Sequence, residues 1–171
     1  MDTLEAILTR RSIRAYTDRP VPASHVRQLM QAAFTAPSAF DERPWHFILL
    51  TDRERLQQLG GAMPGCEMLQ QATLGLLICG DERLEKFPGL WVQDCSACAE
   101  NVLLAAHALG LGAVWLALHP IEDRIRAVRE ACGVPGEVTP FALISMGFPA
   151  ESLPGENRWD DSRLHDETWN A

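Results

Sequence analysis

The chain has 171 residues, of which 47% are hydrophobic, enough for a single domain with a sizeable core. Its formal net charge of −8 argues against nucleic acid as the main partner. No apolar run approaches the roughly 18 residues of a membrane span, and the N-terminus lacks the pattern of a signal peptide. Five cysteines form an odd set that is typical of reduced thiols, so we expect a cytoplasmic protein without a membrane partner.

Hydrophobic periodicity predicts alternating helices and strands along most of the chain. In chain order we expect a helix from Leu4 to the arginines at 10–11, a helix over Val26–Phe34, a strand over His46–Leu50, a helix over Arg53–Leu59, a strand over Thr73–Cys79, a long helix over Trp91–Leu109, a strand over Gly112–Leu118, a helix over Ile121–Cys132 and a strand over Phe141–Gly147. This order is not the regular strand–helix alternation of a doubly wound fold. We therefore expect a single α+β domain over residues 1–171.

The pattern changes after Phe148. Residues 149–171 are polar and contain Pro149, Pro154 and Gly155, yet they carry two large aromatic side chains, Trp159 and Trp169. Large aromatic residues concentrate at protein interfaces. We expect residues 149–171 to form an extended C-terminal arm that docks on a partner subunit.

A cluster of arginines near the N-terminus is the strongest chemical signal in the chain. Arg10, Arg11 and Arg14 surround Ser12, and guanidinium groups match phosphate oxygens two at a time. The cluster predicts a site for a phosphorylated small molecule; a solvated basic face or polyanion patch is the alternative. Because Gly110-Leu111-Gly112 stands between a helix end and a strand start, it is not a dinucleotide-binding loop, and we expect side chains to hold the phosphate.

Several segments, in this order along the chain, resemble the nitroreductase family of FMN-dependent oxidoreductases. They are residues 10–14 (RRSIR), 36–47 (APSAFDERPWHF), 100–107 (ENVLLAAH) running into 110–116 (GLGAVWL), and Arg158. The resemblance implies a nitroreductase-like α+β fold with a central mixed sheet flanked by helices. It also implies a homodimer with an FMN in each of two clefts at the interface.

The implied activity is hydride transfer from NADH or NADPH to FMN, followed by ping-pong reduction of a nitroaromatic, a quinone or a similar electron-poor small molecule. The flavin carries this chemistry, so no catalytic side chain is required of the protein. Two alternatives remain open. One is a specialised family member that acts on an activated double bond, and the other is a non-catalytic module that binds FMN as a sensor or store.

The resemblance assigns flavin contacts residue by residue. By resemblance, Arg10, Ser12 and Arg14 contact the phosphate, the ribityl chain and the pyrimidine edge. Arg11 lies beside them, and Arg158 reaches the phosphate from the arm. The loop against the ring, contributed by the partner subunit, would contain Pro37, Ser38 and Ala39. The segment on the other side of the ring would contain Trp115, Leu116 and Ala117.

One departure from the family pattern concerns the loop. Where the family commonly has Asn-x-Gln-Pro-Trp, this chain has Asp41-Glu42-Arg43-Pro44-Trp45. A carboxylate only accepts hydrogen bonds, whereas an amide also donates. Asp41 at the flavin edge would accept from the ring N–H, and its charge would oppose an anionic reduced flavin. The alternative is that Asp41 pairs with Arg43 and barely touches the flavin.

Other reactive residue types fit packing better than chemistry. Cys95-x-x-Cys98 falls inside the long predicted helix, and Asp94 beside it disfavours a thiolate, so we expect both cysteines in the core. His107 and His119 have no further ligands at metal-binding spacing, so we expect no metal site.

Overall fold

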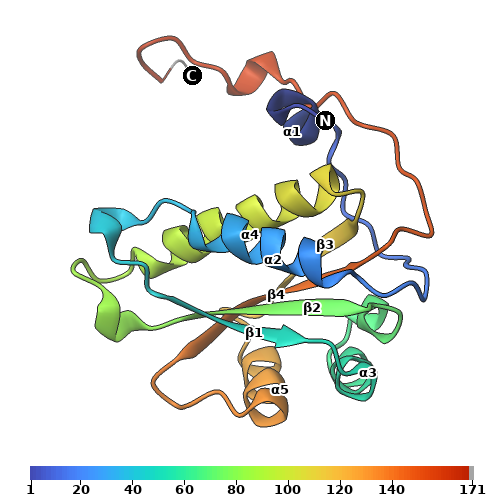
Figure 1. Ribbon diagram of the computed structural model, residues 1–171. Coiled ribbons are helices and arrows are strands. Elements are labelled where there is room, and N and C mark those ends of the chain that lie inside the picture. The colour runs from blue at the N-terminus through green and yellow to red at the C-terminus, as the bar shows by residue number, and fades with distance from the viewer. Residues whose placement is uncertain (170–171) are drawn as a thin grey trace.

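A four-stranded sheet lies between two layers of helices in the computed structural model, which describes residues 1–169 (Figure 1). Side by side in the sheet are β1 (Trp45–Leu50), β2 (Leu74–Gly80), β4 (Thr139–Gly147) and β3 (Gly112–Ala117). Every neighbouring pair is antiparallel. Within residues 1–169, parallel pairing is confined to an isolated bridge between Ser12 and Ala113, which corrects the expected mixed sheet.

Helices cover both faces of the sheet. Figure 1 shows α2 (Ala23–Phe34) and α4 (Trp91–Ala108) on one face, and α3 (Arg53–Ala62) and α5 (Glu122–Cys132) on the other. Each face has its own apolar cluster, and the side chains of β2 and β4 contribute alternately to both. The nine predicted helices and strands are all present, and the α+β fold is confirmed.

The long helix α4 illustrates how the sequence determines an element. Its buried side chains recur at helical spacing, and they include Cys95, Cys98, Val102 and Ala106. The helix ends where Gly110 adopts a left-handed φ of 74°, and the N–H of Leu111 then donates to the carbonyl of Ala106 at 2.9 Å. The predicted central helix is thus confirmed together with its glycine stop.

The two ends of the chain run beside each other. Helix α1 (Thr3–Thr9) lies against the second half of α4, where Thr9 Oγ1 is 2.9 Å from His107 Nε2. Residues 15–17 then pair with residues 148–150, through the N–H of Thr17 to Phe148 O (2.8 Å) and the N–H of Ala150 to Ala15 O (2.9 Å). From there the arm rises past α1, as the red trace in Figure 1 shows.

Short 3₁₀ turns complete the fold at η1 (Ala39–Asp41), η2 (Glu67–Gln70), η3 (Glu82–Leu84) and η4 (Asp161–Arg163). Within residues 1–169, no helix combines the length and the apolar character needed to cross a bilayer. The described part of the predicted arm, residues 149–169, has η4 as its single helical turn.

Candidate functional site

A cavity of about 640 Å³ forms where the arm passes the N-terminal helix. Its lining residues from the N-terminal side are Ile7, Leu8, Arg10 and Arg11, and those from the arm are Gly155, Glu156, Asn157, Arg158 and Trp159. The volume falls within the range of about 300–1,000 Å³ that is usual for small-molecule sites. Three of the predicted phosphate ligands, Arg10, Arg11 and Arg158, therefore line one cavity.

Carboxylates hold the guanidinium groups of this cavity. Arg11 Nη2 lies 3.2 Å from Glu156 Oε1, and Arg158 donates to Glu156 Oε2 from Nε (3.0 Å) and Nη2 (2.8 Å). Arg10 Nε is 3.5 Å from Glu100 Oε1 on α4. The bond from Arg158 and the charge of Arg11 hold the pKa of Glu156 below its usual range. Among the lining residues, three guanidiniums face one carboxylate, so the cavity has an excess of positive charge.

Ser12 and Arg14 lie next to this cavity rather than in its lining. Ser12 forms the bridge to Ala113 on β3, and the Arg14 side chain is exposed. The backbone N–H groups of Arg14 and Ala15 both donate to Glu151 Oε1, at 2.6 and 3.1 Å. Glu151 is thus a second carboxylate of the arm, and it fastens the arm to residues 10–15, called the arginine segment below.

Tyr16 fixes the arginine segment on the sheet. Its buried hydroxyl lies 2.7 Å from the carbonyl oxygen of Ile13 and 3.1 Å from that of Ser145 on β4. Burial raises the pKa of Tyr16 to about 12, so the hydroxyl keeps its proton for donation. A Cβ on Gly112 would lie 2.6 Å from Ile13 Cγ2, and one on Gly147 would lie 3.0 Å from Tyr16 Cβ.

Sequence reasoning missed this support. The available signals were Tyr16, directly behind the arginines, and Gly112 and Gly147, which stand at strand ends. A glycine at a strand end indicates a close approach of some other segment. Periodicity does not tell which segment approaches.

The predicted loop lies at the first turns of α4. The N–H of Ala39 donates to Oδ1 of the buried Asp94 at 2.8 Å. Burial raises the pKa of Asp94, with smaller contributions from Glu42 and Glu85, and its Oδ2 is buried without a hydrogen-bond partner within the described residues. Pro37 is exposed, and Ser38 Oγ accepts from the N–H of Arg43 at 3.1 Å.

Asp41 forms a two-point ion pair with Arg43, through Nε to Oδ1 (2.7 Å) and Nη2 to Oδ2 (3.0 Å). Of the two interpretations of Asp41, this geometry supports pairing with Arg43. Phe40, Asp41 and Arg43 all have left-handed φ values, of 49°, 55° and 50°, a region that non-glycine residues rarely occupy. Lys86 Nζ donates to Phe40 O at 2.7 Å and ties this unusual loop down.

The third predicted segment lies on β3. Trp115 is partly buried and packs edge-on against Phe141, with ring centroids 5.6 Å apart. Leu116 points into the core on the other face, and Ala117 is exposed at the strand end. One chain therefore presents the predicted residues in three places. They are the cavity lined by Arg10, Arg11 and Arg158, called the arginine cavity below, the loop at the start of α4, and β3.

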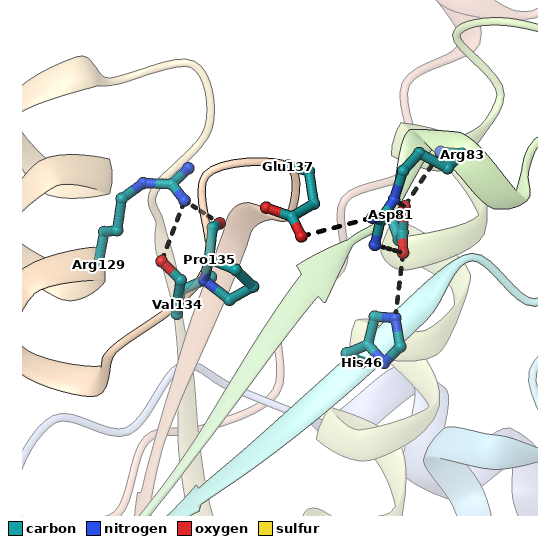
Figure 2. A network of polar contacts seen from close by, with 7 residues as sticks. All are labelled: His46, Asp81, Arg83, Arg129, Val134, Pro135 and Glu137. Carbon is teal, nitrogen blue, oxygen red and sulfur yellow. Dashed lines mark hydrogen bonds and ion pairs between the residues drawn. The ribbon is translucent and has the colours of Figure 1, made fainter.

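A second polar cluster lies after β2, away from the arginine cavity. Figure 2 shows the buried Asp81 held by Arg83, through Nε (2.8 Å) and Nη2 (2.7 Å), and approached by His46 Nε2 at 3.4 Å. Glu137 lies 3.4 Å from the same guanidinium. Arg83 holds the pKa of Asp81 well below its usual range. Because these charges pair with one another, the cluster fixes the turn at η3.

The remaining reactive groups are buried or scattered. Cys95 and Cys98 are fully buried, and burial raises the pKa of both thiols, that of Cys98 to about 12. Their predicted packing role is confirmed. Residues 1–169 contain no group of three His, Cys, Asp or Glu side chains that could hold a metal ion.

Comparison with known proteins decides the family. The model of the nitroreductase family matches residues 7–86 and 65–148. The chain belongs to the nitroreductase family. A relative from Methanothermobacter thermautotrophicus, whose name combines NADH dehydrogenase with NAD(P)H nitroreductase, is 48% identical over 99% of this chain and 88% of its own.

Solved structures agree with this assignment. A Parabacteroides distasonis protein with a similar combined name superposes with a TM-score of 0.93 at 39% identity, covering 98% of each chain. A Desulfovibrio desulfuricans protein crystallised in complex with FMN superposes with a TM-score of 0.84 at 30% identity, covering 99% of each chain. The nitroreductase-like fold predicted from the sequence is confirmed.

Proposed function

We propose that this protein binds FMN, takes a hydride from NADH or NADPH, and reduces small electron-poor acceptors such as nitroaromatics or quinones. The observation that carries the proposal is the convergence of Arg10, Arg11 and Arg158 from opposite ends of the chain on one cavity. Family membership and the FMN complex of the Desulfovibrio desulfuricans relative support it.

The residues of the cavity fit a phosphate monoester. The three guanidiniums are paired with two carboxylates, Glu156 and Glu100, and leave an excess of one positive charge. This excess favours an anionic group such as a phosphate monoester, whose charge at neutral pH is about −1.5 to −2. Ile7, Leu8 and Trp159 give the same cavity an apolar side. When bound, FMN would supply the hydride chemistry in a ping-pong cycle. The protein's part would be to hold the phosphate with Arg10, Arg11 and Arg158, while Ser12 and Arg14 contact the rest of the flavin.

We further propose that the site is completed in a homodimer. Asp94, which holds the loop, and His107, which contacts α1, are 13 residues apart on α4, so the helix separates them by about 20 Å. In this proposal the loop with Pro37, Ser38 and Ala39 reaches the flavin held by the neighbouring subunit, while Asp41 stays paired with Arg43 in that loop. The β3 segment with Trp115, Leu116 and Ala117 borders the flavin ring on its other side.

Exposed apolar side chains support a subunit interface. They gather on α1, at the end of α2, at the loop and on the arm, and they are Leu4, Ile7, Leu8, Phe34, Phe40, Trp159, Leu164 and Trp169. Exposed apolar surface that gathers in one region often marks a protein–protein interaction site. All five cysteines are free, which supports the cytoplasm as the place of action.

The test begins with the purified protein. We expect a flavin absorption spectrum, release of FMN on heating as identified by chromatography, and bleaching of the flavin by NADH or NADPH. Recovery of FAD would refute the assignment. FMN binding without any NAD(P)H oxidation would favour the non-catalytic module instead.

A matched pair of variants tests the phosphate assignment. Arg10→Ala removes charge-assisted hydrogen bonds worth about 1.5–3 kcal/mol, so FMN should bind roughly ten- to a hundredfold more weakly. Arg126→Ala is the control, because Arg126 pairs with Asp123 on α5, on the other face of the sheet. Equal FMN affinity of the two variants in a fluorescence titration would show that Arg10 does not hold the phosphate.

A further inference from the structure

Glu156 occupies an unusual position in the arginine cavity. Its two carboxylate oxygens lie 3.2 Å from Arg11 and 2.8 Å from Arg158, so it engages two of the three guanidiniums assigned to the flavin phosphate. Guanidinium groups bind carboxylates and phosphates through the same paired donors. The donors that would hold a phosphate therefore already have an anionic partner from within the chain.

The backbone that carries Glu156 differs from that of the other carboxylates nearby. Glu100, the partner of Arg10, is on the long helix α4, and Glu151 is fastened by two backbone N–H groups. Glu156 belongs to the arm between Glu151 and η4, where the chain has no regular secondary structure. Its side chain is 49% exposed. A carboxylate on such a segment can withdraw from the guanidiniums without disturbing the core.

We propose that Glu156 is an internal competitor of the flavin phosphate, and that its carboxylate sets the affinity of the site by engaging Arg11 and Arg158. The proposal rests on the proposed binding of FMN in this cavity. A phosphate entering between the two guanidiniums must either displace Glu156 or lie beside its negative charge, and both cost binding free energy. Exposed ion pairs are weak, so the competition tunes affinity rather than preventing binding.

A positioning role for Glu156 predicts the opposite change in FMN affinity. If Glu156 served to orient Arg11 and Arg158 for the phosphate, removal of its charge would weaken FMN binding. The sign of the change in affinity therefore distinguishes a competitor from a positioning residue.

The experiment is a fluorescence titration of the full-length, flavin-depleted protein with FMN and, separately, with riboflavin, which lacks the phosphate. Glu156→Gln keeps the size of the side chain and removes the charge. We expect FMN to bind roughly three- to tenfold more tightly, with riboflavin affinity unchanged. Glu130→Gln is the control, because it makes the same change of net charge at an exposed position of α5.

Each outcome has one interpretation. Failure of the unsubstituted protein to bind FMN would refute the proposed function itself. If that protein binds FMN, then equal or weaker binding by Glu156→Gln overturns the competitor. Equal tightening for FMN and riboflavin, or an equal effect of Glu130→Gln, would overturn it as well, because the effect would then arise from the arm or from net charge and not from the phosphate.

Discussion

Gly112 supports the arginine segment by having no side chain. A Cβ at this position would lie 2.6 Å from Ile13 Cγ2 and 2.9 Å from Ile13 Cβ, against an optimum of about 3.5–4.0 Å between carbon atoms. Rotation of the Ile13 side chain can move Cγ2 but not Cβ. In Gly112→Ala the backbone around Ile13 must therefore retreat from β3 by roughly 0.5–1 Å.

Such overpacking costs about 1–3 kcal/mol, and for a chain of this size that corresponds to a fall in Tm of roughly 2–12 °C. Arg10 and Arg11 belong to the displaced segment, so we expect Gly112→Ala to weaken FMN binding by about tenfold or more. Thermal unfolding followed by circular dichroism measures the first effect, and an FMN titration measures the second.

Gly61→Ala is the matched control. Gly61 is in α3, and nothing lies within 4 Å of its added Cβ, so the change should raise stability by about 0.5–1 kcal/mol and leave FMN affinity unchanged. Adding Ile13→Ala to Gly112→Ala removes Cγ2 and should recover part of the lost affinity. The reasoning would be refuted if Gly112→Ala melted and bound FMN as the unsubstituted protein does.

Two further predictions concern the loop and the arm. Because Asp41 and Arg43 form an ion pair without net charge, Arg43→Ala frees the carboxylate and should lower the flavin reduction potential. The double change Asp41→Asn with Arg43→Ala removes both charges and should leave the potential close to that of the unsubstituted protein. A redox titration in which Arg43→Ala does not move the potential would show that the pair lies away from the flavin. Truncation before Glu156 removes Arg158, Trp159 and Trp169, so it should weaken both FMN binding and the association of the two subunits. Light scattering that shows a dimer of unchanged stability would refute a role of the arm in assembly.

The sequence predicts the elements of this fold well because its apolar residues are strongly periodic, as in α4. It does not predict strand direction. Every residue of β2 is buried, since helices cover both faces, and a continuous apolar run is compatible with parallel and antiparallel neighbours alike. The mixed sheet was expected from the family resemblance, and the apolar pattern of the strands offered no means to correct it.

Only part of the candidate site could likewise be predicted from the sequence. Arg10 and Arg11 are recognisable from their local cluster, but the approach of Arg158 is implied only by the family resemblance, because no local pattern links the two ends of a chain. The carboxylate partners Glu100 and Glu156 could not be predicted either. An acidic chain offers many carboxylates, and only the fold selects which of them meet a guanidinium.

Asp94 and Asp81 are both buried, but they should affect stability with opposite dependence on pH. Burial, with Glu42 and Glu85 nearby, raises the pKa of Asp94. The carboxyl group of Asp94 then holds its proton more tightly in the folded protein than in the unfolded chain. The contribution of Asp94 to the free energy of unfolding is therefore complete below the ordinary pKa of about 3.9, and it is lost as pH rises through the raised pKa. Arg83 lowers the pKa of Asp81, so its stabilisation is complete above the ordinary pKa and is lost as pH falls through the lowered value.

Asparagine substitutions separate the two carboxyls. The amide oxygen of Asp94→Asn can still accept from the N–H of Ala39, and no charge is buried. This variant should therefore gain stability relative to the unsubstituted protein as pH rises from about 4 to about 7. Asp81→Asn should instead lose the ion pair with Arg83, and its deficit should be full at neutral pH and shrink in acid. Urea unfolding of the three proteins, from neutral pH down to well below the ordinary pKa of about 3.9, gives the difference in free energy of unfolding between each variant and the unsubstituted protein. Slopes of the same sign would show that burial does not govern the ionisation of Asp94, and that the hydrogen bond from Ala39 holds it as a carboxylate.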